Sequence, residues 1–234
     1  VVKGINFEGL RDAGDPASLS RRYNKDGIDE VVILDVTATI EKRKALADTI
    51  RRVSAEIFLP LCVGGGIKDE SHANAAIEAG ADKVSLNTAA LQQPELLTTL
   101  AKRYGSQAVI VAIDAKRERN KFHIYIRSGQ QATDRDAVDW AREAADRGAG
   151  EVLLTSIDQD GTKSGFDCEL TSAVSNAVPI PVIASGGAGT FDHFVDVFTK
   201  GQADAALAAS IFHYNEHAVS DLKHYLTHRG IPVR

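Results

Sequence analysis

Two segments of this chain, half a chain apart, have the composition of phosphate-binding elements. Residues 60–66 (PLCVGGG) and 181–187 (PVIASGG) each consist of a proline, three apolar residues, a small residue and two glycines, offset by 121 positions (181 − 60 = 121). The apolar run is typical of a buried parallel strand. Glycines after it let backbone N–H groups approach an anion with no Cβ in the way. The pair predicts a ligand with a phosphate at each end.

An aspartate is the candidate for acid–base chemistry. Asp114 follows the apolar run 108–113, and a carboxylate at the end of a barrel strand faces the pocket, where it can transfer protons. A role as a helix cap or as a partner of Lys116 is the weaker alternative, because a hairpin rather than a helix follows. Asp35 occupies a similar position, although a turn or capping role with nearby Thr37 and Thr39 fits almost as well.

The remaining candidates are small and polar residues at the ends of strand-like runs. In a barrel of alternating strands and helices, ligands bind at the carboxyl ends of the strands. A plain turn needs one glycine rather than matched clusters, so we favour phosphate binding over a role in turns alone. Loop 156–165 is more polar than a connector requires, although Asp158 in it could make only local turn bonds. The predicted binding residues are Gly65, Gly66, Asn87, Thr88, Thr155, Asp160, Gly161, Ser185, Gly186, Gly187, Ala209 and Ser210.

Alternating elements must position these residues. The pattern predicts a parallel sheet with helices outside, in one domain over residues 1–234, with a hairpin insert near 117–127 and a loop-like opening from Lys3 to Asp15. Residues 27–34 also align with 148–155 at the same offset of 121 (148 − 27 = 121), which indicates two related half-barrels. The predicted helices lie near 16–26, 42–57, 70–79, 94–104, 133–147, 168–177, 190–200 and 215–228, and the strands near 31–36, 60–63, 83–86, 108–113, 151–155, 181–185 and 204–208.

The composition excludes several classes of protein. A net charge of −5 argues against nucleic acid as the main partner, and no apolar stretch is long enough to predict a membrane span. We expect no secretory leader, and the two cysteines lack metal-type spacing, so a cytoplasmic setting is predicted. The histidine pairs 213/217 and 224/228 have no acidic third ligand in register, so surface histidines fit better than zinc. We therefore expect no cofactor and no metal.

Charged residues at the opposite ends of the strands form a second group. Glu30 and Glu151 begin strands in the two halves, and Lys83 begins another. Charges at that end of a barrel usually serve stability, so an ordinary ion-pair cluster is the reading that the residues alone favour. Lys3 lies in a glycine-spaced segment that could close over a ligand, although a lone loop lysine is more often solvated surface.

Taken together, these motifs resemble the cyclase subunit of imidazole glycerol phosphate synthase, from histidine biosynthesis. The similarity runs from Val1 to Arg234, and the motifs that carry it are 2–4 (VKG) with 6–7 (NF), 34–38 (LDVTA), 63–67 (VGGGI), 80–85 (GADKVS), 112–115 (AIDA), 160–165 (DGTKSG) and 184–189 (ASGGAG). The resemblance implies a (β/α)8 TIM barrel. It also implies a reaction of ammonia, supplied by a partner glutaminase, with a bis-phosphorylated ribulosyl aminoimidazole-carboxamide. The products are imidazole glycerol phosphate and an aminoimidazole carboxamide ribotide.

The resemblance also assigns roles to individual residues. It implies that Asp114 is one of two catalytic aspartates, that Lys3 contacts substrate and that Asp82 helps to contact the glutaminase. Glu30, Lys83 and Glu151 would form an ammonia gate.

The other aspartate and the gate's arginine belong to a first strand that is absent here. We therefore expect a truncated cyclase with little or no activity, which could associate with a second copy through its open seam. The alternatives are the sister ribosyl aminoimidazole isomerase of the same pathway and a non-catalytic barrel remnant that binds phosphates or a partner.

Overall fold

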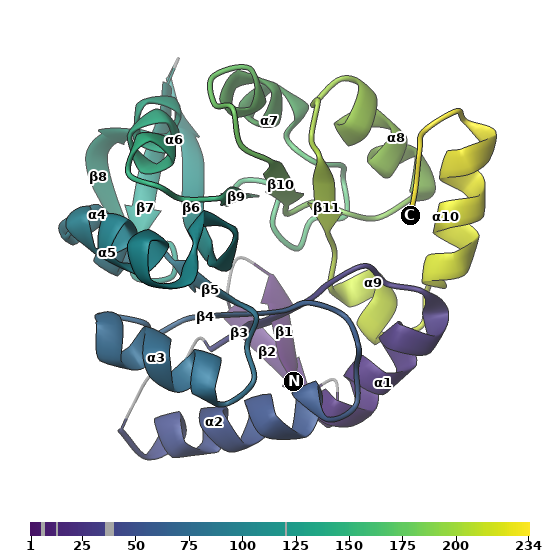
Figure 1. The fold of residues 1–234 in the computed structure, drawn as a ribbon. Coiled ribbons are helices and arrows are strands. Elements are labelled where there is room, and N and C mark those ends of the chain that lie inside the picture. Colours follow the sequence, from purple (N-terminus) through teal and green to yellow (C-terminus); the bar gives the residue numbers. More distant parts are fainter. Residues whose placement is uncertain (6–7, 13, 36–39, 120) are drawn as a thin grey trace.

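The sheet of parallel strands is the central feature of the computed structural model, which describes residues 1–5, 8–12, 14–35, 40–119 and 121–234, and the side chains of 1, 14–35, 46–119 and 121–234. Among these residues, seven parallel strands pair in the order β11-β10-β9-β6-β5-β4-β3, and helices surround them (Figure 1). The predicted α/β barrel architecture is confirmed. The strands are β3 (Val31–Leu34), β4 (Leu61–Gly64), β5 (Lys83–Leu86), β6 (Val109–Glu118), β9 (Glu151–Ser156), β10 (Val182–Ser185) and β11 (Ala205–Leu207).

Eight helices of eight residues or more cover the outside of this sheet in the described part of the chain. Aspartates begin several of them, because a carboxylate accepts hydrogen bonds from the free N–H groups of the first turn. Asp15 accepts from the N–H of Ser18, and Asp167 accepts from that of Leu170. These helices are α1 (Pro16–Asp26), α2 (Ile40–Ser54), α3 (Glu70–Glu78), α5 (Glu95–Tyr104), α6 (Ala137–Asp146), α7 (Cys168–Ser175), α8 (Phe191–Thr199) and α10 (Val219–His228).

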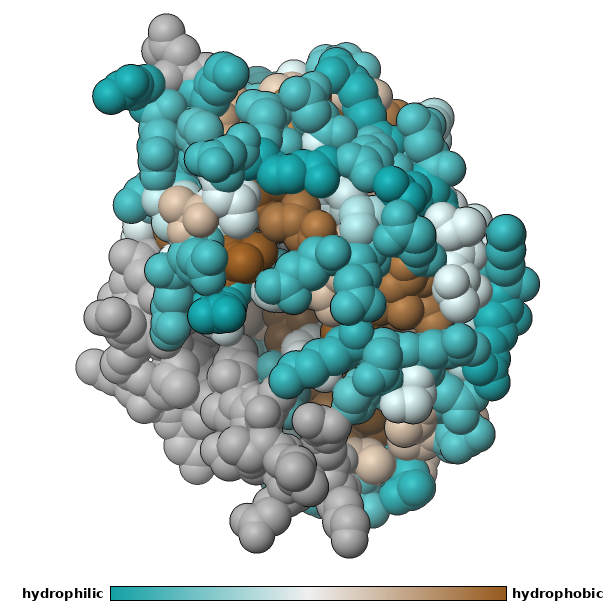
Figure 2. All heavy atoms as spheres, turned by 90° about the vertical axis from the view of Figure 1, so that its left-hand side faces the viewer, coloured by the Kyte–Doolittle hydropathy of each residue, from teal (hydrophilic) through white to brown (hydrophobic). Residues whose placement is uncertain are grey.

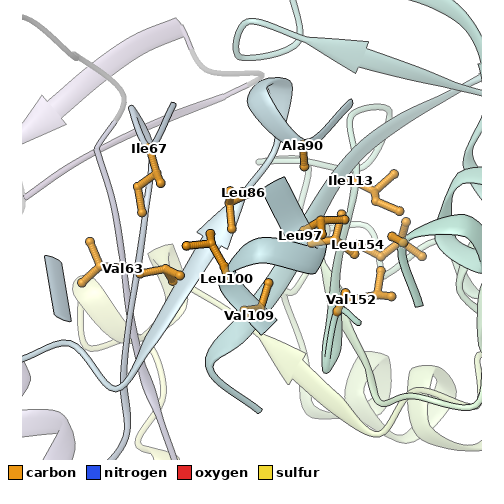
Figure 3. Close-up of a cluster of buried hydrophobic side chains, with 14 of the residues drawn as sticks. Val63, Ile67, Leu86, Ala90, Leu97, Leu100, Val109, Ile113, Val152 and Leu154 are labelled. Carbon is orange, nitrogen blue, oxygen red and sulfur yellow. The ribbon is translucent and has the colours of Figure 1, made fainter. Parts of the chain in front are cut away.

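Successive residues of each strand face opposite sides of the sheet. In β6, Val109, Val111 and Ile113 belong to the large core between the strands and the helices, whereas Ile110 packs inside the barrel with Cys62. Figure 3 shows outward side chains of β4, β5, β6 and β9 meeting those of α5, including Leu97 and Leu100. The view from the side that carries α3, α4 and α5 is mostly hydrophilic, with apolar side chains in small patches (Figure 2). Apolar side chains therefore lie in the core and polar ones on the surface, as the two-residue alternation of side chains along a strand requires.

The two halves use the same hydrogen bonds to fix the register of their strands. Asp82 accepts from the N–H of Leu61 at 2.8 Å, and Asp204 accepts from that of Val182 at 2.9 Å. The carbonyl groups of Pro60 and Pro181 likewise accept from Val31 and Val152, at 3.1 and 2.9 Å. The prolines and aspartates that recur along the sequence thus perform matching local tasks, which supports the assignment of two related half-barrels.

Several predicted boundaries were wrong. The segment from Lys3 to Asp15, expected to be loop-like, contains the antiparallel pair β1 (Val2–Ile5) and β2 (Glu8–Asp12). Residues 131–136, expected to belong largely to a helix, form strand β8 (Gln131–Asp136) beside β7 (Lys121–Ile126). The apolar contacts of the hairpin override helix propensity here, since Phe122, Ile124 and Ile126 are buried.

Short helical turns were also missed. These are α4 (Thr88–Gln92) and α9 (Ser210–His213), each directly after a strand, and the 3-10 turn Ser106–Ala108. Elements of three to five residues carry too little periodicity to be predicted from sequence. No helix in the described ranges is long and apolar enough to cross a membrane.

The single tryptophan packs in the core. Trp140 of α6 is 1% exposed, and the guanidinium of Arg135 lies 4.9 Å from the centre of its ring. This contact closes the end of β8 over the first turns of α6.

The register bond of the second half can be tested by substitution. Asp204→Ala leaves the N–H of Val182 without its acceptor, and we expect the free energy of unfolding to fall by about 1–2 kcal/mol. Asp204→Asn keeps an acceptor oxygen and should retain most of the stability. Urea denaturation of both variants measures the difference; equal losses would show that the carboxylate does not fix the strand through this bond.

Candidate active site

A cavity of about 1830 Å³ extends through the barrel from the carboxyl ends of the strands. It is lined by residues from both halves, so side chains that are 121 positions apart face the same space. Lys3 lies in β1, but its side chain is outside the described part of the structure, as are Thr37 and Thr39, the alternative partners of Asp35. The predicted residues that line the cavity are Glu30, Asp35, Gly65, Gly66, Asn87, Thr88, Asp114, Thr155, Asp160, Gly161, Ser185, Gly186, Gly187, Ala209 and Ser210.

Asp114 occupies the middle of this rim. It lies in β6 opposite Thr155 of β9, and its Oδ2 accepts a hydrogen bond from the side-chain amide of Asn87 at 2.9 Å. Burial raises the pKa of Asp114 to about 7, the bond from Asn87 opposes this rise, and the charge of Asp160 adds to it. A carboxyl group with a pKa near neutrality can give or accept a proton at physiological pH.

The first glycine cluster brings two loops into backbone contact. Gly65 has a φ of +86°, and a Cβ on it would overlap the carbonyl oxygen of Asp35. Asn87 and Thr88 follow the neighbouring strand β5 and line the same part of the rim. Gly65 therefore has a local steric requirement, in addition to its place in the wall of the cavity.

The second cluster repeats this arrangement on the other side, where Gly186, 121 positions after Gly65 (186 − 65 = 121), has a φ of +94° and a Cβ on it would overlap the carbonyl oxygen of Ser156. Gly187 has a φ of +99°, a Cβ on it would overlap the carbonyl oxygen of Gly165, and its own carbonyl accepts from the N–H of Gly165 at 2.8 Å. This bond joins loop 156–165 to the glycines. Asp160, 6% exposed, lies beneath them in the same loop.

Asp158 does not line the cavity. Its Oδ2 accepts from the backbone N–H of Arg117 at 2.9 Å, so it fastens the loop to the far end of β6. Neither expectation holds for this residue, because it does not line the cavity and its bond joins it to a backbone group 41 residues earlier rather than to its own turn.

Ser85, Arg127 and Ser128 are among the cavity-lining residues that sequence reasoning missed. Ser85 is 3% exposed in the apolar run of β5, and its hydroxyl has no hydrogen-bond partner among the described residues. Arg127 and Ser128 lie in the turn between β7 and β8. The alternation of β5 could have placed Ser85 inside, two positions before Asn87, whereas no local signal places the turn.

The charged residues at the amino ends of the strands meet as the pattern indicated. The Nζ of Lys83 donates to Glu30 and to Glu151, at 2.7 Å in each case. Burial works to lower the pKa of Lys83, but the two carboxylates outweigh it and the pKa is raised. Glu30 lines the large cavity, whereas Lys83 and Glu151 line a separate hollow of about 690 Å³ on the outer face. The ion pairs therefore stand between two open spaces.

Asp82 lies on that outer face. One of its oxygens accepts from Leu61, and the side chain also lines the smaller hollow. Beside it is Phe58, 98% exposed. Among the described residues no group of three or more histidine, cysteine, aspartate or glutamate side chains could hold a metal ion. Cys62 and Cys168 are free thiols.

Comparison with known proteins agrees with this geometry. A family model described as histidine biosynthesis protein matches residues 1–218. The imidazole glycerol phosphate synthase subunit HisF of Acidobacterium capsulatum is 56% identical over 234 residues, which cover all of this chain and 92% of the relative. The HisF subunit of Alkaliphilus metalliredigens is 53% identical over 235 positions, covering 100% of this chain and 93% of the relative. This chain belongs to the histidine biosynthesis protein family, and these two relatives are HisF subunits.

Proposed function

We propose that this chain is the cyclase subunit of an imidazole glycerol phosphate synthase. It joins ammonia to a bis-phosphorylated ribulosyl aminoimidazole-carboxamide and releases imidazole glycerol phosphate and an aminoimidazole carboxamide ribotide. The observation that carries the proposal is the position of Asp114, between two glycine clusters that line one cavity. The names of the two relatives favour the cyclase over the sister isomerase.

The rim supplies binding, orientation and proton transfer. Backbone N–H groups of the glycine clusters, with the hydroxyl groups of Thr88 and Ser210, hold the phosphates at the two ends of the substrate. Its reactive middle then lies over Asp114. Because Asn87 lines the cavity together with the first cluster and also donates to the carboxyl group of Asp114, phosphate binding and the orientation of the acid–base residue are linked.

Ammonia enters from the opposite face in this proposal, delivered by a second, glutaminase subunit. Docking at the hollow beside Phe58 and Asp82 covers the outer side of the ion pairs. Exposed aromatic residues next to a concave surface are typical anchors of protein interfaces. Opening of the pairs of Lys83 then connects the hollow to the cavity, so Glu30, Lys83 and Glu151 act as a gate. We place this assembly in the cytoplasm, with no role for nucleic acid or a membrane.

The edge strands suggest a further contact. In the described part of the chain, β3 and β11 each have one parallel neighbour, and Leu34 at the end of β3 is 47% exposed. Unpaired strand edges are templates for pairing with another chain. We propose that a second copy covers this seam when the protein is concentrated.

Asp114→Asn tests the chemistry and the pKa together. The expected loss of activity in this chain stays a prediction. Whatever turnover the native chain has with ammonium salt, the substitution should lower it by at least about a hundredfold, because the amide cannot transfer a proton. The carboxyl group of Asp114 has a pKa of about 7 in the folded chain and an ordinary value of 3.8. The protonated form therefore contributes its full stabilisation below pH 3.8, and this contribution is lost as the pH rises through 7.

The pH dependence provides the control for that experiment. The native free energy of unfolding should fall by at most about 1.4 kcal/mol per unit between about pH 5 and 7, and the variant should lack this fall. Near-native turnover of Asp114→Asn would overturn the proposed function. If the native chain and Asp114→Asn show the same pH dependence of the free energy of unfolding, the raised pKa of Asp114 is wrong.

Phe58→Ser tests the docking face. Loss of an aromatic anchor should weaken association with the glutaminase subunit by about tenfold or more, while turnover with ammonium salt stays unchanged. Phe58→Leu, which keeps an apolar side chain, should retain most of the affinity. Calorimetric titration of the two subunits measures this, and equal affinity of all three proteins would place the glutaminase elsewhere.

Leu34→Lys tests the seam. A lysine at an exposed edge opposes strand pairing between chains. Sedimentation of the native chain at increasing concentration should show a dimer, and the variant should remain monomeric. A native chain that stays monomeric at about 0.1 mM, a concentration at which transient interfaces are populated, rules out the seam contact.

A further inference from the structure

The turn between β7 and β8 brings a basic side chain to the mouth of the cavity. Arg127 and Ser128 line it together with Asn87 and Thr88. The backbone N–H of Arg127 donates to the hydroxyl of Thr88 at 3.2 Å, across 39 residues of sequence. Figure 1 shows the two strands of the hairpin on the same side of the barrel as α4, which Thr88 begins. The turn is thus fastened to the first glycine cluster rather than free in solvent.

In the described part of the chain, no carboxylate pairs with the guanidinium of Arg127. Several other surface arginines pair with carboxylates, as Arg117 does with Glu169 at 2.8 Å and Arg52 does with Asp15 at 2.6 Å. Arg127 has no ion pair with any residue in the described ranges. A guanidinium group carries five N–H donors in a planar fork that matches the oxygens of a phosphate. Its unpaired position beside a predicted phosphate site leaves that fork available to a ligand.

The backbone of the turn is held in an unfavourable conformation. Arg127, Ser128 and Gly129 have φ angles of +55°, +56° and +77°, so two residues with a side chain adopt the left-handed region in succession. Each costs about 1–2 kcal/mol, and such residues persist where their surroundings determine them. Here the bond to Thr88 and the antiparallel pairing of β7 with β6 and β8 supply that constraint. The backbone that carries the side chain of Arg127 is therefore held in one position.

We propose that Arg127 is the counter-ion of the phosphate bound at Gly65, Gly66, Asn87 and Thr88. The hairpin acts as one wall of that phosphate site. The N–H groups of the cluster are neutral, so the arginine supplies the positive charge that balances the phosphate. The identity of the ligand rests on the proposed function. Because the phosphate does not react, Arg127 contributes to binding equally before and during the reaction, so its loss raises KM and leaves kcat unchanged.

Arg127→Gln tests this inference against a matched control from the same hairpin. Arg119 lies in the opposite turn, between β6 and β7, also has a positive φ of +56° and is exposed, but it does not line the cavity. We expect Arg127→Gln to raise KM for the bis-phosphorylated substrate by about ten- to thirtyfold with kcat within about twofold, and Arg127→Lys to recover part of the loss. Arg119→Gln should match the native chain. The effect should shrink as salt is added.

Binding of the two products separately locates the contact. Imidazole glycerol phosphate and the aminoimidazole carboxamide ribotide each carry one phosphate from opposite ends of the substrate. Calorimetry should show that Arg127→Gln weakens one product by about tenfold and leaves the other unchanged. If the native chain turns over substrate but Arg127→Gln behaves as Arg119→Gln does, or weakens both products equally, this inference fails alone. If the native chain binds neither product, the proposed function fails with it.

Discussion

The two-residue repeat of the strands is the constraint on which the site depends. Alternate side chains point into the barrel, so Glu151, Leu153 and Thr155 of β9 lie one above another along its inside. The same period places Lys83, Ser85 and Asn87 along β5. An ion pair at one end, an apolar middle and polar groups at the other end therefore result from one backbone geometry. A shift of one residue in any strand would turn its inward set toward the helices.

Hydrogen bonds accordingly fix the register of neighbouring strands in each of the two halves. The bonds from Asp82 to Leu61 and from Asp204 to Val182 hold neighbouring strands at a fixed offset at the ends that enter the sheet. At the other ends, Gly65 and Gly187 allow loops to approach more closely than any side chain permits. The repeated prolines and glycines of the sequence thus have a structural cause as well as a proposed role in binding. Neither role excludes the other, since the same glycines line the cavity.

Those parts of the fold and site that depend on local pattern could be predicted from the sequence. The strands around Asp114 and both glycine clusters follow from apolar runs and their endings. The turn that carries Arg127 could not be found in this way, because its position depends on a hydrogen bond to a residue 39 positions earlier. Residues 133–136 of strand β8 were mistaken for helix, because they are polar and gain their conformation from pairing with β7. The role of Asp158 likewise depends on a distant backbone group.

Trp140 gives the molecule an unusual optical property. It is the single tryptophan of the chain, it is enclosed in the core, and a guanidinium lies against its ring. Ultraviolet emission from the whole protein therefore originates almost entirely from one point, the start of the second half-barrel. During refolding, this fluorescence would report the docking of α6 onto the sheet, whereas the assembly of β3, β4 and β5 would not change it.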